Sequence, residues 1–188
     1  SALMHMGESR DPTIGTHQSS LHLAEFLIAD RELALKQFRV LSEKVWGQPD
    51  ALEPTFEGKA RVAVWSQDQH MLIDSLPLCD FAFPQVVRPM EDPSEWRSAK
   101  DITGDLELPL RLFSAATGVE IAQEQLDQVA RRAFTLERIM LARAGRSRKM
   151  EETLAPHFTL PCRSDRTCID AAGFARLLDE YYSERGWD

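Results

Sequence analysis

Apolar residues recur at helical spacing through the second half of the chain, and this periodicity is what most constrains the fold. Steps of three and four residues place apolar side chains along one side of a helix, whereas a strand alternates at every second residue. The stripe that shows this spacing best consists of Leu126, Val129, Ala133, Leu136 and Met140. Gly145 follows it, and glycine accepts the left-handed backbone that ends many helices. We therefore predict a long helix in this segment.

Two further segments have the same spacing. One begins after Asp30, a suitable N-cap, and stops at Gly47 and Pro49. The other begins near Asp170 and ends at Gly186. Their stripes are Ala34, Phe38, Leu41 and Val45 in the first, and Phe174, Leu177, Leu178 and Tyr181 in the second. Residues 57–73 are also predicted to be helical, and no stretch has strand-like alternation, so the predicted fold is all-α.

Three prolines separate the two helical halves. Pro84, Pro89 and Pro93 interrupt any regular element between residues 81 and 103, which predicts a long ordered loop. We place the boundary between two packed helical lobes here, with residues 10–100 in the first lobe and 101–188 in the second. Residues 1–9 have no clear pattern, and we expect them to be disordered or derived from a vector.

Charge and cysteine content exclude several classes of partner. The 188 residues have a formal net charge of −8, which gives no electrostatic reason to bind nucleic acid or an anionic membrane. No apolar run is as long as a membrane span, and the N-terminus lacks the pattern of a signal peptide. Three cysteines without framework spacing are typical of a reducing compartment. We expect a cytoplasmic protein.

The segment whose side chains are best suited to bind a ligand or metal is the heptad Asp74-Ser75-Leu76-Pro77-Leu78-Cys79-Asp80. It places a carboxylate and a thiol five residues apart at the end of a predicted helix, with a proline turn between them. Such a turn can present polar groups to a ligand, and a thiolate can bind iron or zinc. By spacing alone, a single cysteine after a helix is more often a small apolar core residue.

The heptad resembles the Asp-x-x-Gly-Leu-Cys-x motif of the tungsten-pterin aldehyde:ferredoxin oxidoreductase family. Four further runs resemble the same family in the expected order. They are Glu57-Gly58-Lys59-Ala60, Ala115-Ala116-Thr117-Gly118, Leu136-Glu137-Arg138 with Arg143-Ala144-Gly145, and Asp179-Glu180-Tyr181-Tyr182 with Arg185-Gly186-Trp187-Asp188. The resemblance covers roughly residues 10–188 and implies the helical C-terminal domains of such an enzyme.

The resemblance implies a set of site residues. Asp74, Ser75, Leu76, Pro77 and Leu78 would form the loop that binds tungstopterin or molybdopterin, and Cys79 would ligate a 4Fe-4S cluster. His17 is a candidate catalytic residue, because a histidine near the metal in this family precedes the cluster cysteine and can move a proton. A loop histidine bonded to its own backbone is the alternative. His5, His22 and His70 gain no support from the resemblance.

The chain departs from the family pattern at two points. Pro77 stands where the family has glycine, and proline removes a backbone donor. The family's other three cluster cysteines, a Cys-x-x-Cys-x-x-x-Cys run, are absent, as is its β-rich N-terminal cofactor domain. A single cysteine cannot hold a 4Fe-4S cluster, so we expect neither cofactor in the isolated chain. We interpret the chain as a C-terminal fragment, or partial homologue, of a longer enzyme.

A basic stretch and two distal cysteines have weaker functional interpretations. The stretch consists of Arg131, Arg132, Arg138, Arg143, Arg146, Arg148 and Lys149. It is typical of a solvated helix face, and the alternative is a surface for an acidic partner such as a ferredoxin-type carrier or the missing domain. Cys162, Cys168 and His157 could be imagined as a zinc site, although their spacing fits no usual finger. A second copy of the chain is a further candidate partner.

The resemblance thus predicts part of an oxidoreductase that converts aldehydes to carboxylic acids and passes electrons to a ferredoxin-type acceptor. A helical binding or scaffold module that kept the fold and lost the cofactors is the alternative. The two hypotheses differ in what they require of the heptad. A heptad that faces a cofactor must be reachable from outside the chain. We therefore expect Asp74 and Cys79 to lie at the surface if the enzyme hypothesis holds.

Overall fold

The computed structural model is all-α over the part of the chain that it describes, which comprises residues 2–8, 29–53, 55–79, 86–89, 92, 94–161 and 168–187. The helices are α1 (Ala2–Gly7), α3 (Arg31–Trp46), α4 (Lys59–Ser75), α5 (Glu95–Ser98), α6 (Leu108–Thr117), α7 (Gln123–Arg143), α8 (Arg148–Glu152), α9 (Ala155–Thr159) and α10 (Ala171–Arg185). No strand is present within these ranges, so the predicted fold class is confirmed.

The helix ends follow the capping signals in the sequence. Asp30 accepts a hydrogen bond from the Leu33 amide at the start of α3, and Gly47 ends this helix in the left-handed region. Asp170 caps α10 in the same way, and Gly186 ends it with a φ of 66°. These boundaries confirm the predicted helices, because each cap residue satisfies backbone groups that the helix itself leaves unpaired.

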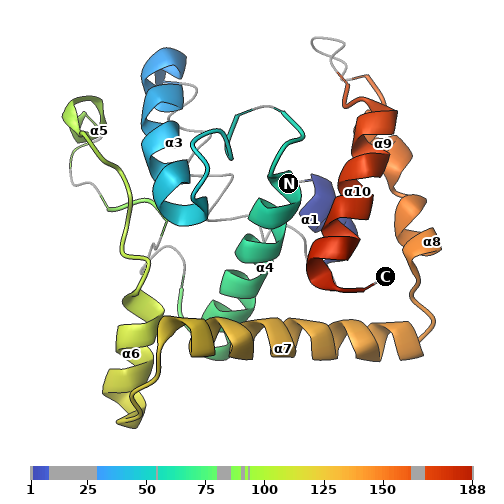
Figure 1. Cartoon of the computed structure of the whole chain (residues 1–188). Coiled ribbons are helices and arrows are strands. Elements are labelled where there is room, and N and C mark those ends of the chain that lie inside the picture. Colours follow the sequence, from blue (N-terminus) through green and yellow to red (C-terminus); the bar gives the residue numbers. More distant parts are fainter. Residues whose placement is uncertain are drawn as a thin grey trace.

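Helix α4 is the centre of the arrangement (Figure 1). It packs against both α7 and α10, and α1 contacts α4 and α8. The long helix α7 runs across one end of α4, while α3 and α5 lie on the opposite side of α4 from α10. Because α4 belongs to the first predicted lobe and α7 and α10 to the second, the two lobes share this interface. The division near residue 100 stays a prediction.

Three apolar clusters make up the core. Side chains from α1, α4 and α10 form one cluster, and Tyr181 is its most buried aromatic side chain. A second joins α3 to residues 86–102, which follow α4, and includes Ala34, Phe38, Trp96 and Ile102. The third joins Leu72 of α4 to Leu126 and Ala130 of α7. The clusters explain why neither α4 nor α7 could be stable alone.

The start of the chain differs from expectation. Residues 2–7 form α1 rather than a disordered segment, and its side chains Leu3, Met4 and Met6 are almost completely buried. Arg146 donates hydrogen bonds to the carbonyl oxygens of Met6 (2.7 Å) and Glu8 (2.8 Å), which fixes the end of this helix. A six-residue helix is too short to show a helical period, so the local pattern could not reveal the partners that bury α1. A vector origin for these residues stays a prediction.

The proline-rich segment contains more structure than the predicted loop. Within its described residues, Glu95–Ser98 form the single-turn helix α5, and Val87 pairs with Thr103 in an isolated antiparallel bridge. Trp96 of α5 is buried, and Gln37 of α3 donates hydrogen bonds to the carbonyl oxygens of Trp96 and Ala99. A buried aromatic residue and a buried amide therefore hold this segment against α3.

Candidate functional site

The heptad begins in the last turn of α4. Leu72 and Ile73 are buried, and Leu76 packs against the cluster that joins α4 to α7. Asp74 and Ser75 lie on the other side of the helix and are exposed. The helical period therefore directs the apolar side chains at this end of α4 into the core and the polar side chains toward the surface.

The turn after α4 has the hydrogen bonding of a Schellman helix end. The Leu78 amide donates to the carbonyl oxygen of Ile73 at 2.9 Å, and the Leu76 amide donates to that of Leu72 at 3.0 Å. In this motif the residue between Leu76 and Leu78 takes a left-handed backbone and donates its own amide to the helix. That residue is Pro77.

Pro77 has a φ of 22°, whereas the proline ring favours a φ near −65°. It also has no amide to donate, so the carbonyl oxygen of Asp74 loses the bond that a glycine at this position would supply. A glycine at this position would end α4 without strain, because it accepts positive φ and keeps its amide. In this chain the same turn is made with a residue that strains it.

Asp74 and Cys79 are both at the surface. Cys79 is a free, exposed thiol, and the side chain of Asp74 retains 31% of its accessible area. His70 lies one turn before Asp74, with its Nε2 atom 3.6 Å from Asp74 Oδ2 and its side chain only 9% exposed. Within the described residues this Nε2 atom has no hydrogen-bond partner. The carboxylate and the thiol are therefore open to a group that approaches from outside, as expected.

The other predicted site residues are less informative. His17 and Asp80 lie outside the described residues, as do His22 and Cys162. Ser75 donates its hydroxyl to the carbonyl oxygen of Met71 at 2.7 Å, and Leu78 is partly buried. His157 and Cys168 are exposed, and no group of three His, Cys, Asp or Glu side chains suited to a metal occurs in the described part. The roles predicted for these residues stay predictions.

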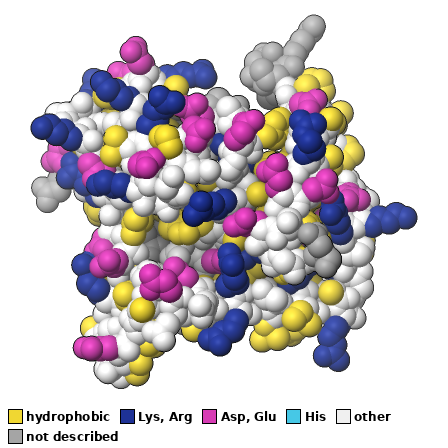
Figure 2. Space-filling view, viewed as in Figure 1, with side chains coloured by type: hydrophobic (Ala, Val, Ile, Leu, Met, Phe, Trp, Pro, Cys, Tyr) yellow, Lys and Arg dark blue, Asp and Glu magenta, His cyan; other side chains and the backbone are white. Residues whose placement is uncertain are grey.

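Most side chains of the predicted basic stretch form ion pairs with carboxylates of the same chain. Arg138 and Arg146 both bind the carboxylate of Glu151, which is 3% exposed. Arg131 pairs with Asp68 at 3.4 Å, and Arg148 pairs with Glu152 at 2.9 Å. Four of the seven basic side chains are thus committed to internal ion pairs, so the stretch is not simply a solvated face. Figure 2 shows acidic and basic side chains intermixed over the visible face, with no single-sign patch.

The buried carboxylate of Glu151 is the centre of a polar network. Tyr182 donates its hydroxyl to Glu151, and Arg138 donates to the Tyr182 oxygen at 2.8 Å. Burial raises the pKa of Tyr182, and the neighbouring negative charge of Glu151 raises it further. Arg138 of the Leu136-Glu137-Arg138 run and Tyr182 of the paired tyrosines therefore serve this network, which joins α7, α8 and α10.

A second network crosses the middle of α4. Arg185 donates to Asp68 at 2.5 Å and to Gln67 at 2.8 Å, and Tyr181 donates to Gln67 at 2.7 Å. The sequence contained a signal for it, because Gln67-Asp68-Gln69-His70 places four polar residues in succession within a predicted helix. All four are buried. A polar run inside a buried helix predicts partners from neighbouring helices.

The fold and the exposed heptad define an all-α module with an acidic side chain and a thiol exposed at the end of α4. The model of a family described as aldehyde ferredoxin oxidoreductase, domains 2 & 3, matches residues 15–188. The chain therefore belongs to the aldehyde ferredoxin oxidoreductase family. No solved structure matches it. Within the described residues, no helix has the length and apolar character needed to cross a membrane.

The residues present fit one edge of the cofactor site that the family implies. An exposed carboxylate can accept hydrogen bonds from the N–H groups of a pterin, and an exposed thiol can ligate iron. One cysteine could supply one of the four ligands of a 4Fe-4S cluster, and the described part contains no group of three His, Cys, Asp or Glu side chains that could hold a metal. Pro77 removes one backbone donor from the same loop. The heptad thus fits a shared site, to which other residues must contribute.

Proposed function

We propose that this chain supplies one wall of the cofactor site in an oxidoreductase that converts aldehydes to carboxylic acids. When bound, a tungsten or molybdenum pterin provides the two-electron chemistry, and a 4Fe-4S cluster provides the route to a ferredoxin-type acceptor. Asp74 would orient the pterin by accepting its N–H groups, and Cys79 would donate its thiolate to iron. The exposure of both side chains at one end of α4 supports this proposal most directly.

The rest of α4 would hold these two side chains in place. Leu72 and Leu76 pack against α7 and fix the end of the helix from which Asp74 projects. A site built on a packed helix positions its ligands more precisely than one on a free loop. A separate N-terminal cofactor domain would complete the site, so the isolated chain is proposed to be inactive. His17 would assist proton transfer, and the protein would act in the cytoplasm.

The proposal can be tested on material isolated from the native source of the protein after anaerobic growth with tungstate, molybdate and iron. We expect stoichiometric tungsten or molybdenum, about four iron atoms per chain, and aldehyde-dependent reduction of a viologen dye. The Cys79→Ser variant should lose the cluster signal in electron paramagnetic resonance. The matched Ser75→Ala variant, altered in the same helix turn, should retain it.

A scaffold that kept the fold without the cofactors is the second candidate function, and the backbone of Pro77 favours it. The strained turn and the lost amide both weaken a pterin-binding loop. Native material that contains neither iron nor a pterin metal and reduces no dye would support the scaffold and contradict the enzyme. A Pro77→Gly variant that gains metal in the same host would identify proline as the cause.

A further inference from the structure

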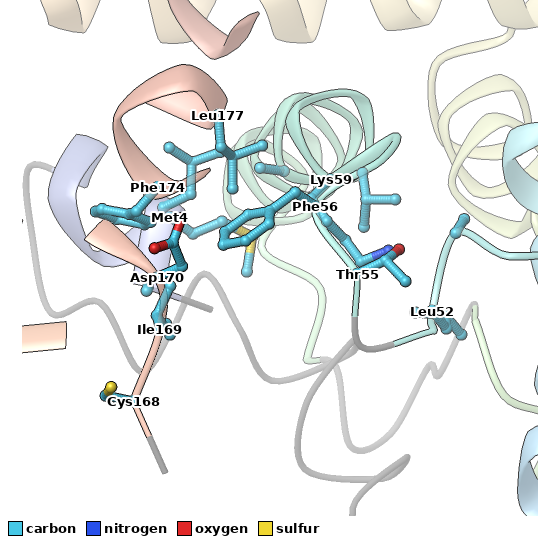
Figure 3. A pocket seen from close by; sticks show the side chains of 15 residues that line it. Met4, Leu52, Thr55, Phe56, Lys59, Cys168, Ile169, Asp170, Phe174 and Leu177 are labelled. Atoms are coloured by element: carbon cyan, nitrogen blue, oxygen red, sulfur yellow. The ribbon is translucent and has the colours of Figure 1, made fainter. Parts of the chain in front are cut away.

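An apolar cavity of about 630 Å³ opens beside the N-terminal end of α4. Its apolar walls come from α1, the turn before α4, α4 itself and α10, and include Leu3, Met4, Leu52, Phe56, Phe174 and Leu177 (Figure 3). Lys59 at this end of α4 is fifteen residues from Asp74, which corresponds to about 22 Å along the helix. The cavity is therefore separate from the heptad, and its volume is in the range of small-molecule sites.

Lys59 brings an amine to this cavity. Its Nζ atom donates to the carbonyl oxygens of Glu57 at 3.2 Å and Asp50 at 3.4 Å. An ammonium has three donors, so these two bonds leave one available. Within the described residues, no carboxylate forms an ion pair with Lys59. Figure 3 shows Lys59 and Thr55 on one side of Phe56, with Phe174 and Asp170 on the other.

The surroundings of Lys59 favour a neutral ligand over an anion. Asp170 lines the cavity, and Asp50, Glu53 and Glu57 carry negative charge close to the lysine. An anionic head group would be repelled by these carboxylates, whereas a neutral carbonyl group would not. Burial lowers the pKa of the Lys59 amine, against the opposing effect of the three nearby carboxylates. A lowered pKa increases the fraction of neutral, nucleophilic amine.

We propose that Lys59 captures apolar aldehydes as a reversible imine, with the aliphatic tail of the aldehyde bound in the cavity. The ammonium first loses a proton to water, and the neutral nitrogen then attacks the carbonyl carbon. A C=N bond replaces the C=O bond, and the carbonyl oxygen leaves as water, so no oxidant or reductant is needed. This inference does not depend on the cofactor site, because it uses only residues of the cavity.

Reductive trapping of the imine tests the proposal on the whole chain. The protein is incubated with octanal and cyanoborohydride, and the alkylated lysines are located and timed by peptide mass spectrometry. Lys36, Lys100 and Lys149 are exposed and serve as internal controls. Octanal is saturated, so the cavity-lining thiol of Cys168 can form only a hemithioacetal, which cyanoborohydride does not trap. Glycolaldehyde, which has no apolar tail, is the matched ligand control.

Octanal should label Lys59 about tenfold faster than the exposed lysines, the ratio that burial of two methylene groups supplies. Glycolaldehyde should show no such preference. The Leu52→Asn variant, altered at a partly buried wall residue, should lose most of the octanal preference while its circular dichroism stays that of a helical protein. Equal labelling of all lysines by octanal would overturn the proposal. An equal preference for Lys59 with both aldehydes would also overturn it, because the cavity would then contribute nothing.

Discussion

Two regions of this molecule resemble the same family motifs but use their polar residues in opposite ways. Around Glu151, the charged and hydroxyl groups of Arg138, Arg146 and Tyr182 are directed inward and bind the Glu151 carboxylate. At the end of α4, Asp74 and Cys79 are directed outward. A residue of a family motif can therefore be committed to the fold or lie at the surface, and burial distinguishes the two cases. Mutations in the two regions should consequently differ in their effect on stability.

The largest effect is expected at Glu151. The Glu151→Ala variant leaves Arg138 and Arg146 without their buried partner, so the free energy of unfolding should fall by about 3–5 kcal/mol. Urea denaturation followed by circular dichroism measures the change. Glu152 is the matched control, because it is adjacent, 47% exposed and paired only with Arg148 in the ion pairs seen here. Its alanine variant should lose less than about 1 kcal/mol.

The two faces of α7 should differ almost as much. Phe134 is 4% exposed, and its ring stacks on that of Trp187 with 6.0 Å between the ring centroids. Phe134→Ala should therefore lower the free energy of unfolding by about 3–5 kcal/mol. Leu136, two residues away, is 59% exposed, and Leu136→Ser should change stability by less than about 0.5 kcal/mol. Thermal and urea unfolding of the two variants would check this. A large loss in the serine variant would show that the exposed face has a partner in solution.

This contrast shows where the sequence was sufficient and where it was not. Caps and periodicity predicted the bounds of α3 and α10 and the end of α7, because both are properties of local sequence. The predicted stripe of α7 was partly wrong about burial. Leu126 is buried, but Leu136 and Met140 are exposed, and Ala130 and Phe134 complete the inward face. Helical period alone permits more than one face, and only the position of α4 decides between them.

The candidate site shows the same limit. The resemblance located the exposed heptad, but it could not show that Pro77 occupies the left-handed position of a helix end, which depends on the actual hydrogen bonds. The Lys59 cavity was also hidden, because its walls come from α1, α4 and α10, which are far apart in sequence. Networks and cavities assembled from distant segments leave only indirect signals in sequence.

Replacing the strained proline should stabilise the end of α4. Pro77→Gly restores an amide that can bind the Asp74 carbonyl oxygen and accepts positive φ without a ring, so unfolding should cost about 1 kcal/mol more. The added entropy of glycine in the unfolded chain reduces the gain. Pro109 in the first turn of α6 is the control, because proline is favourable there and Pro109→Gly should destabilise. A stability loss in Pro77→Gly would contradict the strain argument.

A half-exposed ion pair tests whether burial, rather than charge, separates the two regions. Lys44 of α3 binds Asp101, and hydrogen bonds from Lys44 and Thr103 outweigh the effect of burial and lower the pKa of Asp101 to about 2. A lowered carboxyl pKa contributes stability above its unfolded value of 3.8, and this contribution is lost as the pH falls toward 2. Because the Asp101 side chain is 36% exposed, the contribution should be no more than about 1 kcal/mol.

Stability curves of the parent chain and Asp101→Asn across this pH range would measure that contribution. The difference between them should shrink as the pH falls, and added salt should reduce it at higher pH. A difference as large as that of Glu151→Ala would mean that exposure does not decide how much an ion pair contributes.

The smallest effects are expected at Asp74 and Cys79, and they bear most directly on the role of the heptad. Asp74→Asn and Cys79→Ser should each change the free energy of unfolding by less than about 0.5 kcal/mol, because both side chains project from the surface. The His70 Nε2 atom is 3.6 Å from Asp74 Oδ2, which is too far for a hydrogen bond. Leu72→Ala, on the buried side of the same helix turn, should lower the free energy of unfolding by about 2–5 kcal/mol.

Native Cys79 should also react with a thiol reagent at the rate of an unfolded cysteine. If Asp74→Asn instead destabilised the chain as strongly as Leu72→Ala, Asp74 would belong with the inward residues, and the heptad would no longer support a cofactor site.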